Sequence, residues 1–163
     1  MLNVTLLENH EEIRKNFNAK FLYAEAEYVL HHKDWIEKYA AQGYTWNYDD
    51  LLLWSKMPDY QAISFDRALE FLKSMNCSVY AMSEPPGQYK QGFGQQNVHG
   101  VIQMDAVALA DLIEFEWYEM YRLGDEGPFP ELLLTDDLYV FDPLMEHLLV
   151  FTHENDFWDL EAE

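Results

Sequence analysis

The sequence predicts an α+β fold: a single domain, with helices packed on a mostly antiparallel sheet and a C-terminal β-meander. Three observations lead to this prediction. Apolar residues recur every three or four positions in three stretches, as amphipathic helices require. Short runs rich in β-branched and aromatic residues, bounded by turn residues, lie between and after these stretches. The chain has 163 residues and is 49% hydrophobic, which fits one folded domain.

The first helical stretch spans residues 13–39, and Gly43 is placed to end it. A helix of this length is unusual in a globular protein, so a break is expected near Asn16–Asn18 or near His32–Lys33. Ahead of it, residues 4–7 indicate a short strand or the lead-in to the helix.

The second helical stretch is bounded by two recognisable caps. Ser64 is a good N-cap, residues 65–75 place their apolar side chains on one face, and Asn76 closes the helix. The β-branched and aromatic residues at positions 77–82 then predict a strand. Before this helix, residues 49–54 are expected to form a short helix of their own, capped by an aspartate.

Residues 83–97 contain two prolines, three glycines and four glutamines, which predicts a long exposed loop that is either functional or mobile. A strand at 98–104 should follow it. The third helical stretch, residues 105–123, begins at an aspartate suited to cap it. Residues 132–134 and two further strands, at 138–141 and 147–152 on either side of an Asp-Pro turn, form the predicted meander.

The net charge of −20 is unevenly distributed along the chain. Residues 1–100 hold 13 acidic and 9 basic residues, a net of −4, whereas residues 101–163 hold 17 acidic residues and only Arg122, a net of −16. A field of this sign repels the phosphates of nucleic acids, which argues against direct DNA or RNA binding through a basic surface. It would attract and steer a basic protein.

The residues from Met1 to Val4 lack the basic and apolar segments of a signal peptide, and no apolar run approaches the length needed to cross a bilayer. An acidic chain is also repelled by anionic lipid headgroups. The single cysteine, Cys77, rules out an internal disulfide. We therefore expect a cytoplasmic protein that does not associate with membranes.

The sequence holds no catalytic motif that we can support. Gly92-Phe93-Gly94 lacks the third glycine of a dinucleotide-binding loop, and neither a phosphate-binding P-loop nor a G-x-S-x-G motif occurs. The six histidines are scattered in the sequence, so we expect no metal site and no cofactor. Cys77 is expected to be a buried small side chain, the alternative being a nucleophile beside His99.

The acidic residues of the third helix admit two interpretations. Their abundance serves solubility in the first, and forms a recognition surface in the second. The scarcity of basic residues in this half is unusual for the first, because a surface built for stability normally mixes charges of both signs, but it leaves both interpretations open. Four carboxylates are expected on the solvated side, away from the apolar stripe: Asp111, Glu114, Glu116 and Glu119.

The closing stretch, Asp136 to Pro143 running into Leu149 to Glu154, resembles the C-terminal hairpin of small bacterial proteins that are either uncharacterised or immunity proteins of toxin systems. The resemblance covers about 30 of the 163 residues. It implies an acidic inhibitor that occludes the active site of a basic toxin, often a nuclease.

We therefore expect an acidic protein-binding module of the inhibitor or immunity type, which occludes a basic partner such as a toxin nuclease. The predicted partner-binding residues are Glu114, Glu116, Tyr118, Glu119, Asp136, Asp137, Asp142, Glu146, Glu154, Asp156 and Trp158. The alternative is an enzyme or small-ligand-binding protein with a pocket beneath residues 83–97. The predicted lining residues of that pocket are Tyr80, Tyr89, Phe93 and His99.

Overall fold

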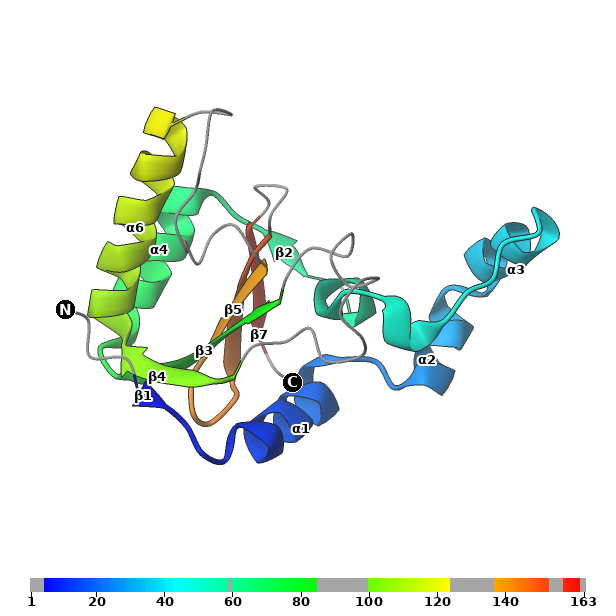
Figure 1. Cartoon of the computed structure of the whole chain (residues 1–163), viewed down its shortest axis with the longest axis horizontal. Coiled ribbons are helices and arrows are strands. Elements are labelled where there is room, and N and C mark those ends of the chain that lie inside the picture. The colour runs from blue at the N-terminus through cyan, green and yellow to red at the C-terminus, as the bar shows by residue number, and fades with distance from the viewer. Residues whose placement is uncertain (1–4, 59, 85–99, 124–136, 153–156, 162–163) are drawn as a thin grey trace.

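The computed structural model describes residues 5–58, 60–84, 100–123, 137–152 and 157–161. Seven strands are present in these residues: β1 (Thr5–Leu6), β2 (Gln61–Ala62), β3 (Ser78–Glu84), β4 (Ile102–Asp105), β5 (Asp137–Phe141), β6 (His147–Phe151) and β7 (Phe157–Glu161). They form one sheet in the order β1-β4-β3-β5-β6-β7-β2, and every neighbouring pair is antiparallel (Figure 1). The predicted α+β class is confirmed.

Within the described residues the helices are α1 (His10–Phe21), α2 (Glu25–His31), α3 (Lys33–Ala41), α4 (Phe65–Met75) and α6 (Ala106–Leu123), with two 3-10 turns, η1 (Tyr48–Asp50) and η2 (Leu53–Lys56). Strands β5, β6 and β7 are consecutive in the chain and adjacent in the sheet, which confirms the C-terminal meander. Its last strand, β7, was not predicted, and residues 132–134, the first predicted segment of the meander, lie outside the described residues. Residues 85–97 of the predicted loop lie outside the described ranges, whereas Ser83 and Glu84 still belong to β3.

Both faces of the sheet are covered by other elements, and the side chains of each strand alternate between the two resulting cores. Val79 and Ala81 of β3 face a core built with α4 and α6. Tyr80 and Met82 face the opposite core, which α1 and η2 cover. In Figure 1, α4 and α6 lie side by side on one side of the sheet and α1 lies apart from them.

The local signals for helix ends are largely confirmed. The hydroxyl oxygen of Ser64 accepts a hydrogen bond from the Arg67 backbone N–H at 3.2 Å. Asn76 ends α4 in the left-handed conformation, with φ of 46°, which asparagine tolerates better than most residues. A carboxylate oxygen of Asp105 accepts from the Ala108 backbone N–H at 3.0 Å and caps α6.

The stretch at 13–39, which was expected to break into two helices, forms three. The break at His32 is confirmed, whereas the break expected at Asn16–Asn18 is wrong, because α1 continues to Phe21 around the buried ring of Phe17. The chain is extended at Leu22 and at Ala24 before α2 begins. The short helix expected at 49–54 is replaced by η1 and η2.

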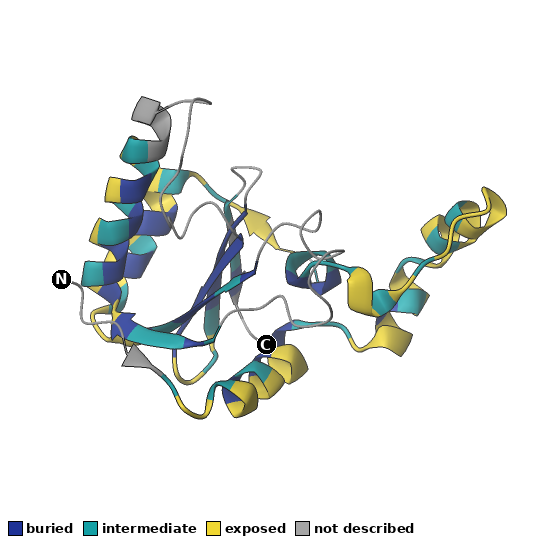
Figure 2. Cartoon of the chain, viewed as in Figure 1, coloured by how far each residue is buried: buried dark blue, intermediate teal, exposed yellow. Residues whose placement is uncertain are grey.

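Helices α2 and α3 form an arm that extends away from the sheet (Figure 1). No residue of α3 is buried, and much of the arm is exposed in Figure 2. Stacked rings join the arm internally: Trp35 stacks on Tyr39 and Tyr39 on Tyr44, with ring centroids 5.2 and 4.8 Å apart. Across the described residues, no helix is long and apolar enough to cross a membrane.

Candidate functional site

The outer side of α6 presents aromatic side chains to solvent. Phe115 is 61% exposed and Tyr118 is 63% exposed, although both rings are large enough to be core residues. They share an arc of roughly 100° on the helix with Val107, Asp111 and Glu114, at 100° per residue. We call these five residues the α6 face. The opposite side of the helix packs in the core through Leu109, Ala110 and Ile113.

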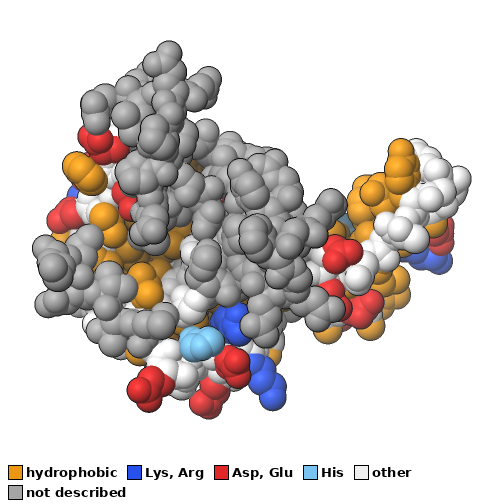
Figure 3. Space-filling model, in the orientation of Figure 1, with side chains coloured by type: hydrophobic (Ala, Val, Ile, Leu, Met, Phe, Trp, Pro, Cys, Tyr) orange, Lys and Arg blue, Asp and Glu red, His pale blue; other side chains and the backbone are white. Residues whose placement is uncertain are grey.

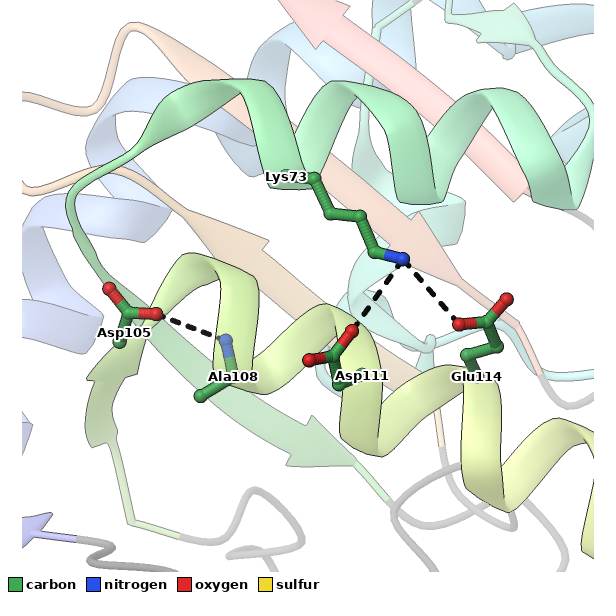
Figure 4. A network of polar contacts seen from close by, with 5 residues as sticks. All are labelled: Lys73, Asp105, Ala108, Asp111 and Glu114. Carbon is green, nitrogen blue, oxygen red and sulfur yellow. Dashed lines mark hydrogen bonds and ion pairs between the residues drawn. The ribbon is translucent and has the colours of Figure 1, made fainter.

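The carboxylates of the α6 face have a basic neighbour. It comes from residues 1–100, so the scarcity of basic residues in 101–163 did not indicate it. Lys73 of α4 places its ammonium 3.6 Å from Asp111 and 3.5 Å from Glu114 (Figure 4). The two carboxylates and one ammonium leave a local net charge of −1. Exposed ion pairs of this kind contribute only about 0–1 kcal/mol to folding stability. The main effect of Lys73 is therefore to reduce the negative charge of the α6 face.

The predicted partner-binding residues separate into surface and interior positions. Tyr118 and Glu146 are exposed, and Glu114 and Glu119 are partly buried. Glu116, Asp137 and Asp142 are buried, so their assignment to a surface is wrong. Asp136, Glu154 and Asp156 lie outside the described residues. Trp158 belongs to β7, opposite Val150 of β6 and Ala62 of β2.

Asp142 shows why one of these carboxylates is inside. It follows β5, and one of its oxygens accepts hydrogen bonds from the backbone N–H groups of Glu146 at 2.9 Å and His147 at 2.8 Å. The turn also contains Met145 at a positive φ of 54°. The carboxylate therefore holds the β5–β6 turn in shape.

Glu84 and Asp137 lie directly opposite each other on β3 and β5, and are 1% and 0% exposed. One Glu84 oxygen accepts from the Leu53 backbone N–H and from the Tyr139 hydroxyl, both at 2.9 Å. The Trp54 indole N–H donates to Asp137 at 2.9 Å, and the Trp54 backbone N–H donates to the Tyr139 hydroxyl at 3.1 Å. This Glu84–Asp137 cluster, made of Glu84, Asp137, Tyr139 and Trp54, ties η2 to the centre of the sheet.

Burial raises the pKa of the Tyr139 hydroxyl well above its usual value of about 10, and the nearby negative charges of Glu84 and Asp137 raise it further. Above pH 10 the unfolded chain loses this proton while the folded protein keeps it. Because the unfolded state then binds fewer protons, the free energy of unfolding should fall as pH rises above about 10, by up to about 1.4 kcal/mol per pH unit.

Urea unfolding of the native protein and of Tyr139→Phe at pH 9, 10 and 11 checks this expectation. The variant should be less stable at pH 9, because it lacks the bond to Glu84, but should lose less stability between pH 10 and 11. Burial also raises the pKa of Tyr28 and of Tyr48, so some slope should remain in the variant. Equal slopes in the two proteins would contradict the assignment to Tyr139.

Of the residues predicted to line a pocket, Tyr80 is partly buried on β3, and its ring and that of Phe141 form a T-shaped pair. Tyr89, Phe93 and His99 lie outside the described residues. The described residues do form a cavity at another place, between α1, η2 and β3. The sequence did not predict it, because its lining comes from three segments that are far apart in the chain.

Cys77 is exposed just before β3, so the expectation that it is buried is wrong. Among the described residues, no three His, Cys, Asp or Glu side chains are grouped so that they could hold a metal ion. The paired histidines of the arm serve packing: the ring of His31 stacks on Tyr23, and that of His32 stacks on Tyr28, at centroid distances of 4.5 and 4.0 Å.

No protein-family model, no curated protein and no solved structure matches the chain. The function must therefore be inferred from the chemistry of its own residues.

Proposed function

We propose that this chain is a cytoplasmic protein-binding module of the inhibitor or immunity type, which occludes a basic partner protein such as a toxin nuclease. The observation that carries the proposal is the α6 face, where Phe115 and Tyr118 are more than half exposed beside Asp111 and Glu114. Figure 3 shows hydrophobic and acidic side chains next to one another over α6.

The two kinds of side chain have complementary parts in binding. Covering an exposed aromatic ring with a partner is favourable, because it removes apolar surface from water. Aromatic residues are also frequent among the few interface residues that contribute most of the binding free energy. Carboxylates around them steer a basic partner and fix its orientation, and they contribute more to the association rate than to affinity. The α6 face therefore suits a partner with an apolar depression bordered by lysine or arginine.

The charge of the chain supports a basic partner in particular. Residues 101–163 carry a net charge of −16, and α6 is the longest helix in the described part of that half. A nuclease binds phosphates through a basic cleft, and carboxylates can occupy the positions where it binds phosphates. Occlusion of that cleft would inhibit such a partner without any chemical step by this protein.

The first test is to capture a partner protein by photo-crosslinking at the α6 face. A photo-reactive benzoylphenylalanine placed at Tyr118 should crosslink, in a lysate of the native host, a protein of net positive charge. The same group placed at Leu144, which is 76% exposed on the β5–β6 turn, is the control. Crosslinking of the same protein from both positions, or of none from Tyr118, would count against the proposal.

The captured partner then allows a measured affinity. Asp111→Asn/Phe115→Ala/Tyr118→Ala should weaken binding at least about tenfold, because it removes both aromatic anchors and one steering charge. A matched triple variant, Glu12→Gln/Leu30→Ala/Leu144→Ala, removes one carboxylate and two side chains that are even more exposed, and should change the Kd less than about twofold. Equal losses would mean that total charge, rather than the α6 face, governs binding.

A further inference from the structure

The α2–α3 arm exposes aromatic side chains away from the rest of the fold. No residue of α3 is buried, Trp35 is 46% exposed and Tyr44 is 56% exposed. Figure 3 shows hydrophobic side chains gathered on this arm, and Figure 1 shows it extending away from the sheet and from α6. A helix of nine residues is marginal in water by itself, so a partner that covers these rings would also stabilise α3.

The aromatic residues of α3 lie on one side of the helix. At 100° per residue, four residues share an arc of about 140°: Asp34, Trp35, Lys38 and Tyr39. We call these four residues the α3 strip. The ring of Tyr39 is stacked with those of Trp35 and Tyr44, so the strip presents an apolar surface that the arm itself holds in place.

The α3 strip carries one charge of each sign. Asp34 and Lys38 are both exposed, and neither takes part in an ion pair with any described residue. The other two charged residues of α3, Lys33 and Glu37, lie outside the strip and pair with each other at 4.0 Å. Helix α3 is therefore neutral, and its strip offers no net attraction to a strongly basic or a strongly acidic partner.

The order of its residues makes the α3 strip complementary to itself. When two copies of α3 pack antiparallel about a twofold axis, each contact between the copies occurs twice. In a register centred between residues 36 and 37, Asp34 lies level with Lys38 of the second copy, and Trp35 with Tyr39 of the second copy, each within about 1.5 Å along the helix axes. This register brings aromatic rings together at the same time as opposite charges.

Two copies of a chain with a net charge of −20 repel each other, and a contact at the arms reduces that repulsion. The body of the protein joins α3 through α2, at the N-terminal end of α3 (Figure 1). An antiparallel pair therefore places the two bodies at opposite ends, separated by the length of α3, about 13 Å. Because exposed charges are screened over about 8 Å at physiological salt, the arms can meet where the bodies would repel.

We propose that the arm binds the arm of a second copy of this chain, so that the protein forms a symmetric dimer through an antiparallel pair of α3 strips. The rings of Trp35 and Tyr39 supply the apolar contact, and two ion pairs between Asp34 of one copy and Lys38 of the other fix its direction. The face of one short helix is smaller than the roughly 800 Å² per partner of a standard interface, so the dimer is a weak one, with a Kd of about 10–300 µM. The α6 face is not part of this contact, which is therefore independent of the function proposed above.

Sedimentation equilibrium of the full chain tests the dimer. Between about 5 and 500 µM protein, the apparent mass should rise from that of the 19.3 kDa monomer towards twice that value. Trp35→Ala should weaken dimerisation about tenfold or more. The matched control, Phe115→Ala, removes an exposed ring from the α6 face and should change the Kd less than about twofold. A monomer at every concentration, or an equal loss in the control, would overturn the proposal.

Charge reversal tests the direction of the pair. Asp34→Lys and Lys38→Asp each place like charges opposite one another, so each variant alone should dimerise about tenfold more weakly. An equimolar mixture of the two variants pairs opposite charges at both positions, and should recover a Kd within about threefold of the native value.

The control for charge reversal lies outside the α3 strip. Lys33→Asp and Glu37→Lys, alone or mixed, should keep the native Kd within about twofold. Failure of the Asp34→Lys and Lys38→Asp mixture to recover would show that the α3 strips do not face each other, as would an equal loss in the control variants.

Discussion

Replacement of Phe17 by alanine is expected to lower the free energy of unfolding by about 3–5 kcal/mol. The Phe17 side chain is 0% exposed and lies between α1 and the sheet. Its ring centroid is 5.1 Å from Phe21, 4.9 Å from Phe141 and 5.9 Å from Tyr139. Because three rings surround it, the neighbours cannot collapse to fill the space, and a cavity would remain.

Urea unfolding measures this loss as a fall in the midpoint at unchanged slope. The matched control is Phe115→Ala, which removes the same side chain from a position that is 61% exposed and should cost about 0.5 kcal/mol or less. Similar losses in both variants would mean that Phe115 is covered in solution, or that Phe17 is not a centre of packing.

The second large effect is expected at the Glu84–Asp137 cluster. Glu84→Ala should lower the free energy of unfolding by about 3 kcal/mol, because the Leu53 N–H and the Tyr139 hydroxyl lose their acceptor inside the protein. Glu84→Gln retains an oxygen that can accept, so about half of that loss is expected. Ser78→Ala, at an exposed position of the same strand, is the control and should change stability by about 0.5 kcal/mol or less.

The same variants compare two opposing effects in the cluster. Glu84 and Asp137 are carboxylates at directly opposite positions of neighbouring strands, where like charges repel. If that repulsion exceeded the contribution of the hydrogen bonds, Glu84→Ala would be more stable than the native protein in urea unfolding. We expect the hydrogen bonds to dominate, because the Glu84 oxygen has two donors within 2.9 Å.

Features set by neighbouring residues could be predicted from the sequence. The cap at Ser64 and the cap at Asp105 depend on side chains within three positions along the chain, and both are present. The order of strands depends on contacts between distant segments, which local patterns do not encode. Strand β1 lies within residues 4–7, where a short strand was one of the two expectations, whereas β2 is two residues long and too short for an alternating pattern to indicate it.

The buried carboxylates had a sequence signal that the abundance of acidic residues obscured. On β3, Glu84 follows Tyr80 and Met82 at every second position, so alternation places it on their side of the sheet. Asp137 stands in the same relation to Tyr139. On α6, Glu116 lies three residues after Ile113, at the edge of the buried stripe, and is 4% exposed. As acidic residues, all three would be expected at the surface. Their positions within the strands and the helix place them in the interior instead.

The strand order constrains how a ribosome-bound chain can fold. Phe17 and Phe21 emerge early in synthesis, yet the core around them needs Phe141, Leu148 and Leu160, which emerge near the end. Edge strand β2 pairs only with β7 in the described sheet, and must wait for it as well. The apolar side of α1 therefore remains uncovered through most of translation, and a chaperone that shields it should raise the yield of folded protein.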